Sequence, residues 1–415
     1  MFAVKYNPES QDRTALLLDI AKAHGSPTFV YDLDVISRNY RAYAEAMGEQ
    51  HLICYAVKAN ANLDVLRHLV SLGSGFDIVS GGELMRVLRA GGDAGKVVFS
   101  GVGKTDQEIR FALGARIKCF NVESESELRR ISMLAVEEGR VANISLRINP
   151  DVDAGTHPYI STGLKENKFG IPMEEARGLY ALAGELHNLK VVGVDCHIGS
   201  QLTDLGPFND ALERVLALVD ALQTDGIKLQ HIDMGGGLGI AYNAERLPSK
   251  AAYIGIFRER IEALGMQLII EPGRSLVAEC GSLISEVICI KDTQGKRFVV
   301  ADTAMNDNLR PALYGAEHRI SVLQSQCREQ PQLCDLVGPV CETADTLAKK
   351  IPLAVEEGDL LLMHDVGAYG FAMSSNYNAR PRAAEVVIKG DEFSLARRRE
   401  TFADMVACEN MYWNQ

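Results

Sequence analysis

The residue with the clearest chemical potential is Lys58, which stands at the polar end of the apolar run 53–57. Such a run is typical of a buried strand, and a lysine that ends a barrel strand would project into a cavity. Burial makes an amine lose its proton more easily, and a neutral amine can attack a carbonyl group to form a Schiff base. Most lysines that follow a strand are simply solvated, so this interpretation depends on what else the chain supplies.

An enzyme that uses pyridoxal phosphate also needs a phosphate site, an acid at the pyridine nitrogen and a group against the ring face. Gly235, Gly236 and Gly237 follow one apolar run, and glycines let backbone N–H groups approach an anion closely. Glu271 ends the next run, where its carboxylate can pair with a protonated ring nitrogen. The alternative for Glu271 is a local salt bridge with Arg274.

Four further candidates stand at or near the ends of other apolar runs. His197 offers a flat ring to stack on the cofactor, and Ser200 offers a hydroxyl for its phosphate. Asp77 and Arg147 are also placed there. A lone histidine is more often structural than functional, and charged residues are common at strand ends. Each position is therefore weaker evidence for a functional site alone than in combination with the others.

The elements that must position these residues follow from eight short apolar runs. Segments with apolar i, i+3, i+4 spacing, such as 63–70 and 128–135, separate the runs and predict amphipathic helices. Eight alternations of strand and helix predict a (β/α)₈ barrel of the TIM type. A doubly wound open sheet is the alternative, but 235–240 lacks the glycine pattern of a dinucleotide-binding loop. The runs are 54–57, 76–79, 97–99, 118–122, 144–148, 191–197, 231–234 and 268–270.

The pattern changes after about residue 276. The runs 283–290 and 297–301 flank a turn sequence and predict a hairpin, and the run 383–388 precedes another turn. We therefore expect the barrel to span 26–276. A second, mostly β domain is expected to span 277–415, with residues 1–25 packed against it.

The composition predicts a globular protein with a small metabolite as its ligand. The 415 residues carry a formal net charge of −12, which disfavours nucleic acid and anionic membranes because both bind basic surfaces. The N-terminus lacks a signal-peptide core and no apolar run reaches membrane-spanning length, so we expect a cytoplasmic protein. Nine cysteines without a Cys-x-x-Cys pair suit a reducing compartment and predict no metal site.

Six motifs give the chain a specific resemblance. They lie at 55–60, 197–201, 235–237, 271–274, 341–345 and 367–369. In order and spacing they resemble those of the fold-type III pyridoxal-phosphate decarboxylases, over nearly the whole chain. Within that group the chain is similar to the bacterial diaminopimelate decarboxylases, chiefly through 161–170 and 305–314. One departure is Asn308, where the family more often has an apolar residue.

The resemblance implies pyridoxal 5'-phosphate as the cofactor and assigns roles to the candidates. Lys58 would carry the cofactor, His197 would stack on its ring and Glu271 would face its nitrogen. The expected cofactor-binding set is Lys58, Asp77, Arg147, His197, Ser200, Gly235, Gly236, Gly237, Glu271, Gly273, Arg274 and Tyr369. The expected substrate-binding set is Arg274, Arg310, Tyr314, Glu342 and Tyr369, of which Glu342 would receive the distal ammonium and Arg274, Arg310 and Tyr314 the distal carboxylate.

The family also implies a catalytic role for Cys341, which would return a proton after carbon dioxide is lost. By spacing alone Cys341 would count as a small apolar filler. In the family, Cys341 and Glu342 reach the site from the neighbouring subunit. A homodimer with shared active sites is therefore implied, and the catalytic set is Lys58, His197 and Cys341.

We therefore expect the decarboxylation of meso-2,6-diaminopimelate to L-lysine. An arginine on the carboxylate that leaves would oppose its loss, whereas one on the distal carboxylate only positions the substrate. Alternatives are a related decarboxylase that acts on ornithine, arginine, D-lysine or another amino acid, and one that serves a specialised pathway. An amino-acid racemase on a similar barrel and a single-barrel pyridoxal-phosphate homeostasis protein are more distant alternatives.

Overall fold

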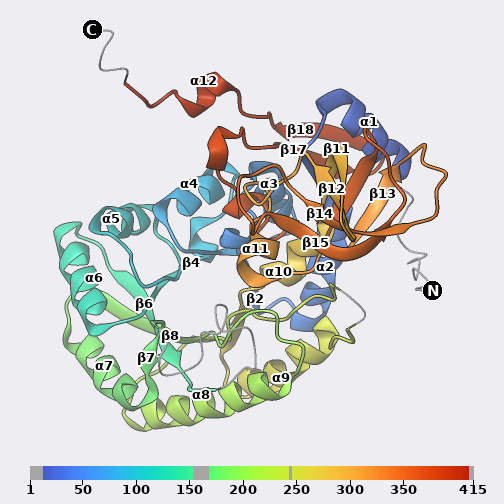
Figure 1. Ribbon diagram of the computed structural model, residues 1–415. Coiled ribbons are helices and arrows are strands. Elements are labelled where there is room, and N and C mark those ends of the chain that lie inside the picture. The colour runs from blue at the N-terminus through green and yellow to red at the C-terminus, as the bar shows by residue number, and fades with distance from the viewer. Residues whose placement is uncertain (1–12, 153–167, 243–244, 411–415) are drawn as a thin grey trace. The chain divides into compact units, whose positions relative to one another are not determined.

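The computed structural model describes residues 13–152, 168–242 and 245–410 (Figure 1). The chain divides into two compact units. The first unit is Val35–Glu279. The second unit joins the described residues up to Asp34 with those from Cys280 onward.

The first unit is a closed barrel of eight parallel strands, which confirms the predicted fold. Neighbouring strands pair in parallel, and the last strand closes the barrel on the first through the register Ile269↔Leu52 and Ile270↔Ile53. The eight strands are β2 (Leu52–Ala56), β3 (Gly75–Ile78), β4 (Val97–Phe99), β5 (Cys119–Val122), β6 (Ala142–Asn149), β8 (Leu189–Cys196), β9 (His231–Asp233) and β10 (Gln267–Ile270). A two-residue strand, β7 (Ile171–Pro172), pairs beside β6.

Helices connect the barrel strands and, as Figure 1 shows for α5 to α9, lie around their outside. The connecting helices are α3 (Leu63–Ser71), α4 (Gly81–Arg89), α5 (Asp106–Ala115), α6 (Glu125–Glu137), α7 (Met173–Glu185), α8 (Gly206–Thr224) and α9 (Lys250–Glu262). Helix α2 (Leu33–Met47) precedes the first barrel strand, and α10 (Arg274–Val277) follows the last. The predicted spacing is confirmed, because Leu66 in α3 and Ile131 in α6 are buried. Ser80, Thr105 and Ser124 each accept a backbone N–H from the following turn, which sets where α4, α5 and α6 begin.

The interior of the barrel is apolar in one layer and polar in another. Cys54, Val98, Cys119, Val192 and Ile269 come from five different strands and pack together in one buried cluster. Acidic side chains are also buried in the barrel, including Asp77, Asp195, Asp233 and Glu271. Because buried acids are costly unless they have partners, they mark the functional end of the barrel.

The second unit is built on a mixed sheet. Its strands are β1 (Thr28–Asp32), β11 (Gly281–Thr293), β12 (Lys296–Ala301), β13 (Ile320–Gln324), β14 (Gln332–Val337), β15 (Thr346–Leu353), β16 (Leu360–His364), β17 (Ala384–Lys389) and β18 (Glu392–Arg397). The hairpin of β11 and β12 and the strand β17 are where the turn signals predicted them. The expected barrel range included residues 28–32, whereas β1 pairs with β11 and β17 in this sheet.

Three short helices complete the second unit, and they are α1 (Thr14–His24), α11 (Arg310–Tyr314) and α12 (Phe402–Met405). Leu17 and Ile20 of α1 pack into a cluster with strand residues such as Val30 and Val386. This contact fixes the described start of the chain against the mixed sheet. Among the described helices, none is both long and apolar enough to cross a membrane.

Candidate active site

Lys58 lies in a 3₁₀ turn, η1 (Val57–Ala59), directly after β2. Its Nζ is 3.1 Å from Asp77 Oδ2, which comes from the neighbouring strand β3. The Asp77 side chain is fully buried, while 38% of the Lys58 side chain is exposed. The ion pair therefore holds the amine at the carboxyl end of the barrel, where a ligand in the mouth can reach it.

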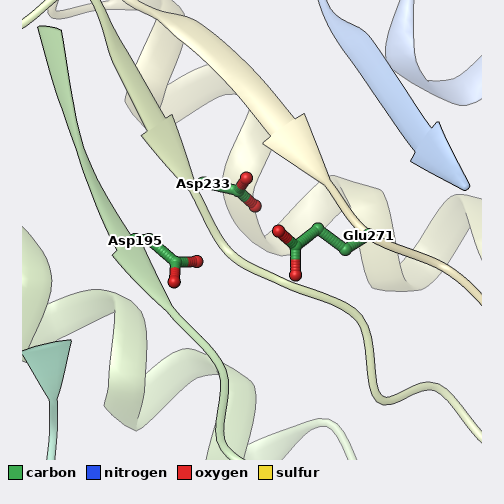
Figure 2. A group of neighbouring side chains, drawn as sticks. All are labelled: Asp195, Asp233 and Glu271. Carbon is green, nitrogen blue, oxygen red and sulfur yellow. The ribbon is translucent and has the colours of Figure 1, made fainter. Parts of the chain in front are cut away.

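Glu271 follows β10 and faces two other acids from neighbouring strands, as Figure 2 shows. Asp195, Asp233 and Glu271 each place a carboxylate oxygen within 4.8 Å of the others. Glu271 Oε1 accepts a hydrogen bond from Asn121 Nδ2 at 3.3 Å, and Ser100 Oγ lies 3.5 Å from the same oxygen. Burial raises the pKa of Glu271 well above its usual range, and the nearby carboxylate of Asp233 adds to the effect.

The glycine turn after β9 packs too closely for side chains. A Cβ atom on Gly236 would lie 2.3 Å from the backbone oxygen of Glu271, and one on Gly237 would lie 2.6 Å from that of Gly199. Gly237 also has a φ of +115°, which favours glycine. Backbone without side chains is what a bound phosphate requires for close approach.

His197 follows β8 and is fixed by that turn. The backbone N–H of Gly236 donates to His197 Nδ1 at 3.1 Å, so the other ring nitrogen, Nε2, carries the proton of the neutral ring. Burial lowers the pKa of His197 well below its usual value, and the nearby guanidinium of Arg147 acts in the same direction. The histidine is therefore a neutral flat ring, which suits stacking on an aromatic cofactor.

Arg274, the first residue of α10, links two segments of the barrel mouth. Its Nη2 donates to Ser200 Oγ at 3.1 Å, and its Nη1 donates to Tyr242 Oη at 2.9 Å. Gly199 lies beside Ser200 in the chain and touches Gly237, so the hydroxyl, the guanidinium and the glycine turn share one region. Gly273 precedes α10 as its N-cap.

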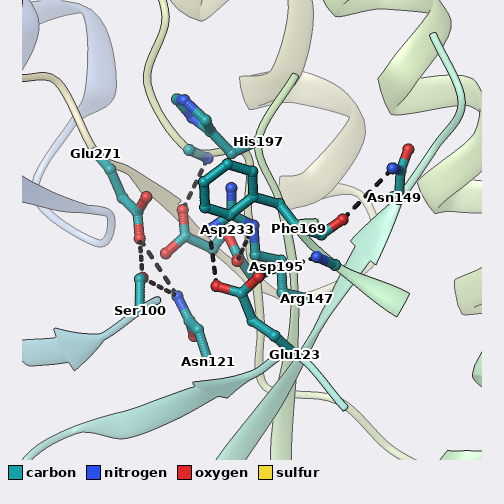
Figure 3. Close-up of polar contacts among 12 residues, drawn as sticks. Ser100, Asn121, Glu123, Arg147, Asn149, Phe169, Asp195, His197, Asp233 and Glu271 are labelled. Carbon is teal, nitrogen blue, oxygen red and sulfur yellow. Dashed lines mark hydrogen bonds and ion pairs between the residues drawn. The ribbon is translucent and has the colours of Figure 1, made fainter. Parts of the chain in front are cut away.

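Arg147 in β6 is surrounded by acids and an aromatic ring (Figure 3). Its Nη1 lies 3.1 Å from Glu123 Oε1, and its Nε lies 3.8 Å from Asp195 Oδ2. The guanidinium carbon is 5.2 Å from the centre of the Phe169 ring. These contacts make Arg147 a counter-charge within the barrel wall.

The other expected substrate residues belong to the second unit and are described within it. Arg310 and Tyr314 stand four residues apart in α11 and so share one face of the helix. Arg310 Nη1 donates to His318 Nε2 at 3.1 Å, and His318 Nδ1 donates to the backbone oxygen of His364 at 2.9 Å. The guanidinium is therefore held in place by a neutral histidine.

Cys341 and Glu342 are exposed in the segment between β14 and β15. The Cys341 backbone N–H donates to Asn378 Oδ1 at 2.8 Å, and the Tyr377 hydroxyl donates to the Glu342 carboxylate. Exposure excludes the alternative of a buried apolar filler for Cys341. Asp345 accepts backbone N–H groups from both this segment and the one before α11, at 2.8 and 2.7 Å.

Tyr369 and Asn308 are two further positions of note in the second unit. Tyr369 has a φ of +59°, which a bulky residue adopts only where its surroundings impose it, often at functional sites. The unusual Asn308 is buried and donates to Met363 Sδ at 3.2 Å, while its Oδ1 has no hydrogen-bond partner among the described residues. Of the motif 161–170, residues 161–167 lie outside the described residues.

Known proteins resemble this chain along most of its length. Residues 33–278 match the model of the pyridoxal binding domain of pyridoxal-dependent decarboxylases. A diaminopimelate decarboxylase of Pseudomonas aeruginosa is 56% identical over 393 residues, which cover 94% of each chain. The chain belongs to the diaminopimelate decarboxylase family. This confirms the fold-type III group predicted from the six motifs and, within it, the family predicted chiefly from 161–170 and 305–314.

Two further members of the family support this assignment. The diaminopimelate decarboxylase of Neisseria meningitidis serogroup A is 53% identical over 391 residues, covering 94% of this chain and 96% of that one. The crystal structure of diaminopimelate decarboxylase from Helicobacter pylori complexed with L-lysine has a TM-score of 0.91 and 44% identity. It covers 95% of this chain and 99% of that one, so both units share the fold.

The family uses pyridoxal phosphate, and the described residues of the barrel fit such a group. The barrel mouth offers an amine at Lys58 and a turn at Gly236 that admits no side chain. It also offers a neutral ring at His197 and a buried acid at Glu271. A pyridoxal phosphate molecule has an aldehyde, a phosphate, a ring face and a ring nitrogen, and these four features are of the chemical kinds that could accommodate them.

Sequence reasoning missed several residues of the site in this family member. Asp195, Asp233, Glu123 and Asn121 surround Glu271 and Arg147, and none was among the candidates. A signal was present, because Asp195 stands two residues before His197 and the two-residue period of a strand places both on one face. Tyr242 had no comparable signal.

Proposed function

We propose that the protein is a carboxy-lyase that decarboxylates meso-2,6-diaminopimelate at its D-centre to give L-lysine, the last step of lysine biosynthesis. The observation that carries the proposal is the 56% identity to a diaminopimelate decarboxylase over 94% of both chains. Pyridoxal phosphate, when bound, supplies the electron sink that receives the electron pair left by carbon dioxide.

The barrel residues bind and orient the cofactor in this proposal. Lys58 would supply the amine that holds the cofactor through its aldehyde. The glycine turn 235–237, Ser200 and Tyr369 hold the phosphate, His197 lies against the ring and Glu271 faces its nitrogen. The remaining residues of the proposed cofactor site, which support these groups, are Asp77, Arg147, Gly273 and Arg274.

Substrate choice is assigned to a clamp on the far end of the substrate. Arg310 and Tyr314 bind the distal carboxylate together with Arg274, and Glu342 receives the distal ammonium. An arginine that holds a carboxylate in two hydrogen bonds distinguishes an amino-dicarboxylate from a simple diamine precursor. The ordered guanidinium of Arg310, held by His318, supports this role.

We further propose a cytoplasmic homodimer with active sites shared between subunits, without nucleic acid or membrane partners. Cys341 would then return the proton to the carbon that loses carbon dioxide, from the neighbouring subunit. The exposure of Cys341 and Glu342 in the single chain supports this arrangement. All nine cysteines are free, which supports a reducing compartment.

The test is a substrate panel in which carbon dioxide release and product are measured together. Meso-diaminopimelate should release carbon dioxide and yield L-lysine, while L-lysine, L-ornithine and L-arginine should release little. Faster release from ornithine, arginine or D-lysine would replace the proposed substrate. Change of configuration without carbon dioxide release would instead indicate a racemase.

A further inference from the structure

The carboxyl end of the barrel buries more acids than bases. Five carboxyl groups there are at most 7% exposed, and they are Asp77, Glu123, Asp195, Asp233 and Glu271. Among the residues that the structure describes, the two cations that contact them are Lys58 and Arg147. Because a buried negative charge without a partner is very costly, five ionised carboxylates cannot coexist with two cations in this space.

Two of the five carboxyls have strong partners. Asp77 Oδ2 lies 3.1 Å from the Lys58 amine. Glu123 lies 3.1 Å from Arg147 and also accepts the backbone N–H groups of Gly101 and Gly170, both at 2.9 Å. Both groups therefore have a cation within reach of an ion pair.

Asp195 is an intermediate case. Its Oδ2 lies 3.8 Å from Arg147 Nε, too far for a good hydrogen bond but close enough for attraction between charges. Burial raises the pKa of Asp195 to about 7, and the Arg147 charge opposes that rise. Asp195 therefore loses its proton more readily than it would by burial alone, because Arg147 favours its charged form.

Asp233 and Glu271 differ from the others because, within the described residues, neither forms an ion pair. Asp233 Oδ1 accepts the backbone N–H of Gly235 at 2.9 Å, but Asp233 Oδ2 is buried without a hydrogen bond from any described group. Glu271 has only the neutral donors Ser100 and Asn121. Their carboxylate oxygens lie within 4.8 Å of each other, so two ionised groups would repel, whereas a proton on one of them removes that repulsion.

The strand register makes this contact a fixed feature of the barrel. Asp195 and Asp233 are aligned partners on β8 and β9, and Asp233 is aligned with Ile269 on β10. Glu271 stands two residues after Ile269, so it points to the same side of the sheet. Figure 2 shows the three carboxyl groups facing one another.

We propose that Asp233 and Glu271 share a single proton. When a positively charged ring nitrogen faces Glu271, Asp233 carries that proton and Glu271 is ionised. The inference rests on the proposed place of Glu271 at the nitrogen of the cofactor. The charge of the pair is −1 both before and after cofactor binding. No proton has to enter or leave the closed end of the site, and only its position within the pair changes.

The surrounding groups agree with this assignment. Burial raises the pKa of Asp233 well above its usual range, and the neighbouring Asp195 carboxylate is the next cause. The other titratable groups that face the pair are neutral at physiological pH, since burial raises the pKa of the thiols and the phenol and lowers that of the imidazoles. They are Cys54, Cys119, Cys196, Tyr253, His197 and His231. Among the described residues, Lys58 acts as a cation on Glu271, and Arg147 acts on the neighbouring Asp195.

The test is infrared spectroscopy of the holoenzyme in ordinary and heavy water at about pH 8.5, where carboxylic acids in water are fully ionised. A carbonyl band of a neutral carboxylic acid should be present in the parent enzyme and should shift in heavy water. Asp233→Asn keeps the shape and the acceptor for Gly235 but cannot hold an acid proton, so the band should be lost. Asp195→Asn is the matched control and should keep the band.

Every outcome bears on the proposal. Absence of the band from the parent enzyme, its survival in Asp233→Asn or its loss in Asp195→Asn would overturn the assignment to Asp233. A divalent cation that co-purifies in place of the band would do the same. If Asp233→Asn does not fold, Glu271→Gln decides, because burial and the Asp195 carboxylate still raise the pKa of Asp233 in that variant and the band should persist; its loss would assign the acid proton to Glu271.

The readout separates this inference from the proposed activity. The band is measured without substrate, so an enzyme that proves to act on another amino acid would still show it. The same spectra on cofactor-free protein should also contain the band, because the pair holds its proton in both forms. Loss of the band on removal of the cofactor would show that the proton belongs to the cofactor site alone and would overturn the shared pair.

Discussion

The backbone N–H of Gly236 donates a 3.1 Å hydrogen bond to Nδ1 of His197, so the glycine turn and the histidine form one hydrogen-bonded unit. The turn closes on β8 through this bond and on β10 through the Glu271 backbone N–H, which donates to the Gly235 oxygen at 2.7 Å. The groups proposed for the phosphate, the ring face and the ring nitrogen are therefore fixed by the same few backbone contacts.

A methyl group on Gly236 should disrupt this hydrogen-bonded unit. In Gly236→Ala the new Cβ would lie 2.3 Å from the Glu271 backbone oxygen, so the turn must move away from both His197 and Glu271. We expect a loss of stability of about 1–3 kcal/mol from overpacking and weaker binding of pyridoxal phosphate. Thermal unfolding and cofactor titration by absorbance measure the two effects.

A matched glycine provides the control for this substitution. Gly255 lies within α9 and has no atom within 4 Å of a Cβ built on it. Gly255→Ala should stabilise the protein by about 0.5–1 kcal/mol and leave cofactor affinity unchanged. Equal cofactor affinity in the two variants would mean that the glycine turn does not touch the cofactor.

The stability of the protein in acid should depend on His231. Burial lowers its pKa to about 3, so the folded protein keeps the ring neutral while the unfolded chain takes up a proton near pH 6.5. The contribution of neutral His231 to the free energy of unfolding is therefore complete above pH 6.5. It is lost as the pH falls toward 3, at up to about 1.4 kcal/mol per pH unit. His231→Gln should reduce the slope of unfolding free energy against pH by about one proton in this window.

The comparison between parent and variant separates the effect of His231 from that of groups whose contribution to the free energy of unfolding changes with pH in the opposite direction. Asp195, Asp233 and Glu271 have raised pKa values, so their contributions are lost as the pH rises, but they are common to both proteins. Urea unfolding at several pH values gives the slopes. Identical slopes in the two proteins would show that His231 is protonated in the folded state.

The fold was largely predictable because barrel strands are buried on both faces. That burial requires nearly continuous apolar runs, so all eight strands could be located from the positions of these runs in the sequence, to within a few residues at each end. The strand β7 was not predicted, since Ile171 and Pro172 are too short a segment to give any periodicity. Lys58, His197 and Glu271 were predicted because they end such runs, which is where a barrel gathers its site.

The acids behind Glu271 were not predictable in the same way. Asp195 and Asp233 are neighbours only because β8 and β9 pair in the register that aligns them. Hydrophobic periodicity locates a strand but does not align it with the next one. A single acid within an apolar run is visible in the sequence, yet its partner is known only from the assembled sheet.

Removal of the proposed clamp should affect substrate binding and spare the cofactor. Arg310→Ala removes at least one charged hydrogen bond to the distal carboxylate, worth about 1.5–3 kcal/mol, so KM for meso-diaminopimelate should rise at least roughly 10- to 150-fold. Because the clamp acts alike on bound substrate and transition state, kcat should change less. Steady-state kinetics and cofactor titration measure these quantities.

Arg319 supplies the control for the clamp, since it is exposed and close to Arg310 in the chain. Arg319→Ala should leave KM and kcat at the parental values. A normal KM in Arg310→Ala would remove Arg310 from the clamp. A loss of cofactor absorbance in that variant would instead assign it to the cofactor site.

The proposed sharing of active sites can be tested by complementation between two inactive variants. Lys58→Ala should lose the visible absorbance of the lysine-bound cofactor, and Cys341→Ala should lose about 10²–10⁴-fold in rate as a general acid is removed. In a mixed dimer, one site receives both an intact Lys58 and an intact Cys341. Equal mixing should therefore recover roughly a quarter of parental activity if subunits exchange freely in a two-fold dimer.

The outcome depends on which chain supplies Cys341 to a given Lys58. If both came from the same chain, every mixed dimer would contain only defective sites and no activity would return. A Cys341→Ala enzyme at the parental rate would contradict the proton-donor role itself. Mixing two preparations of Lys58→Ala is the control, and it should recover nothing, because no site in that mixture contains the amine.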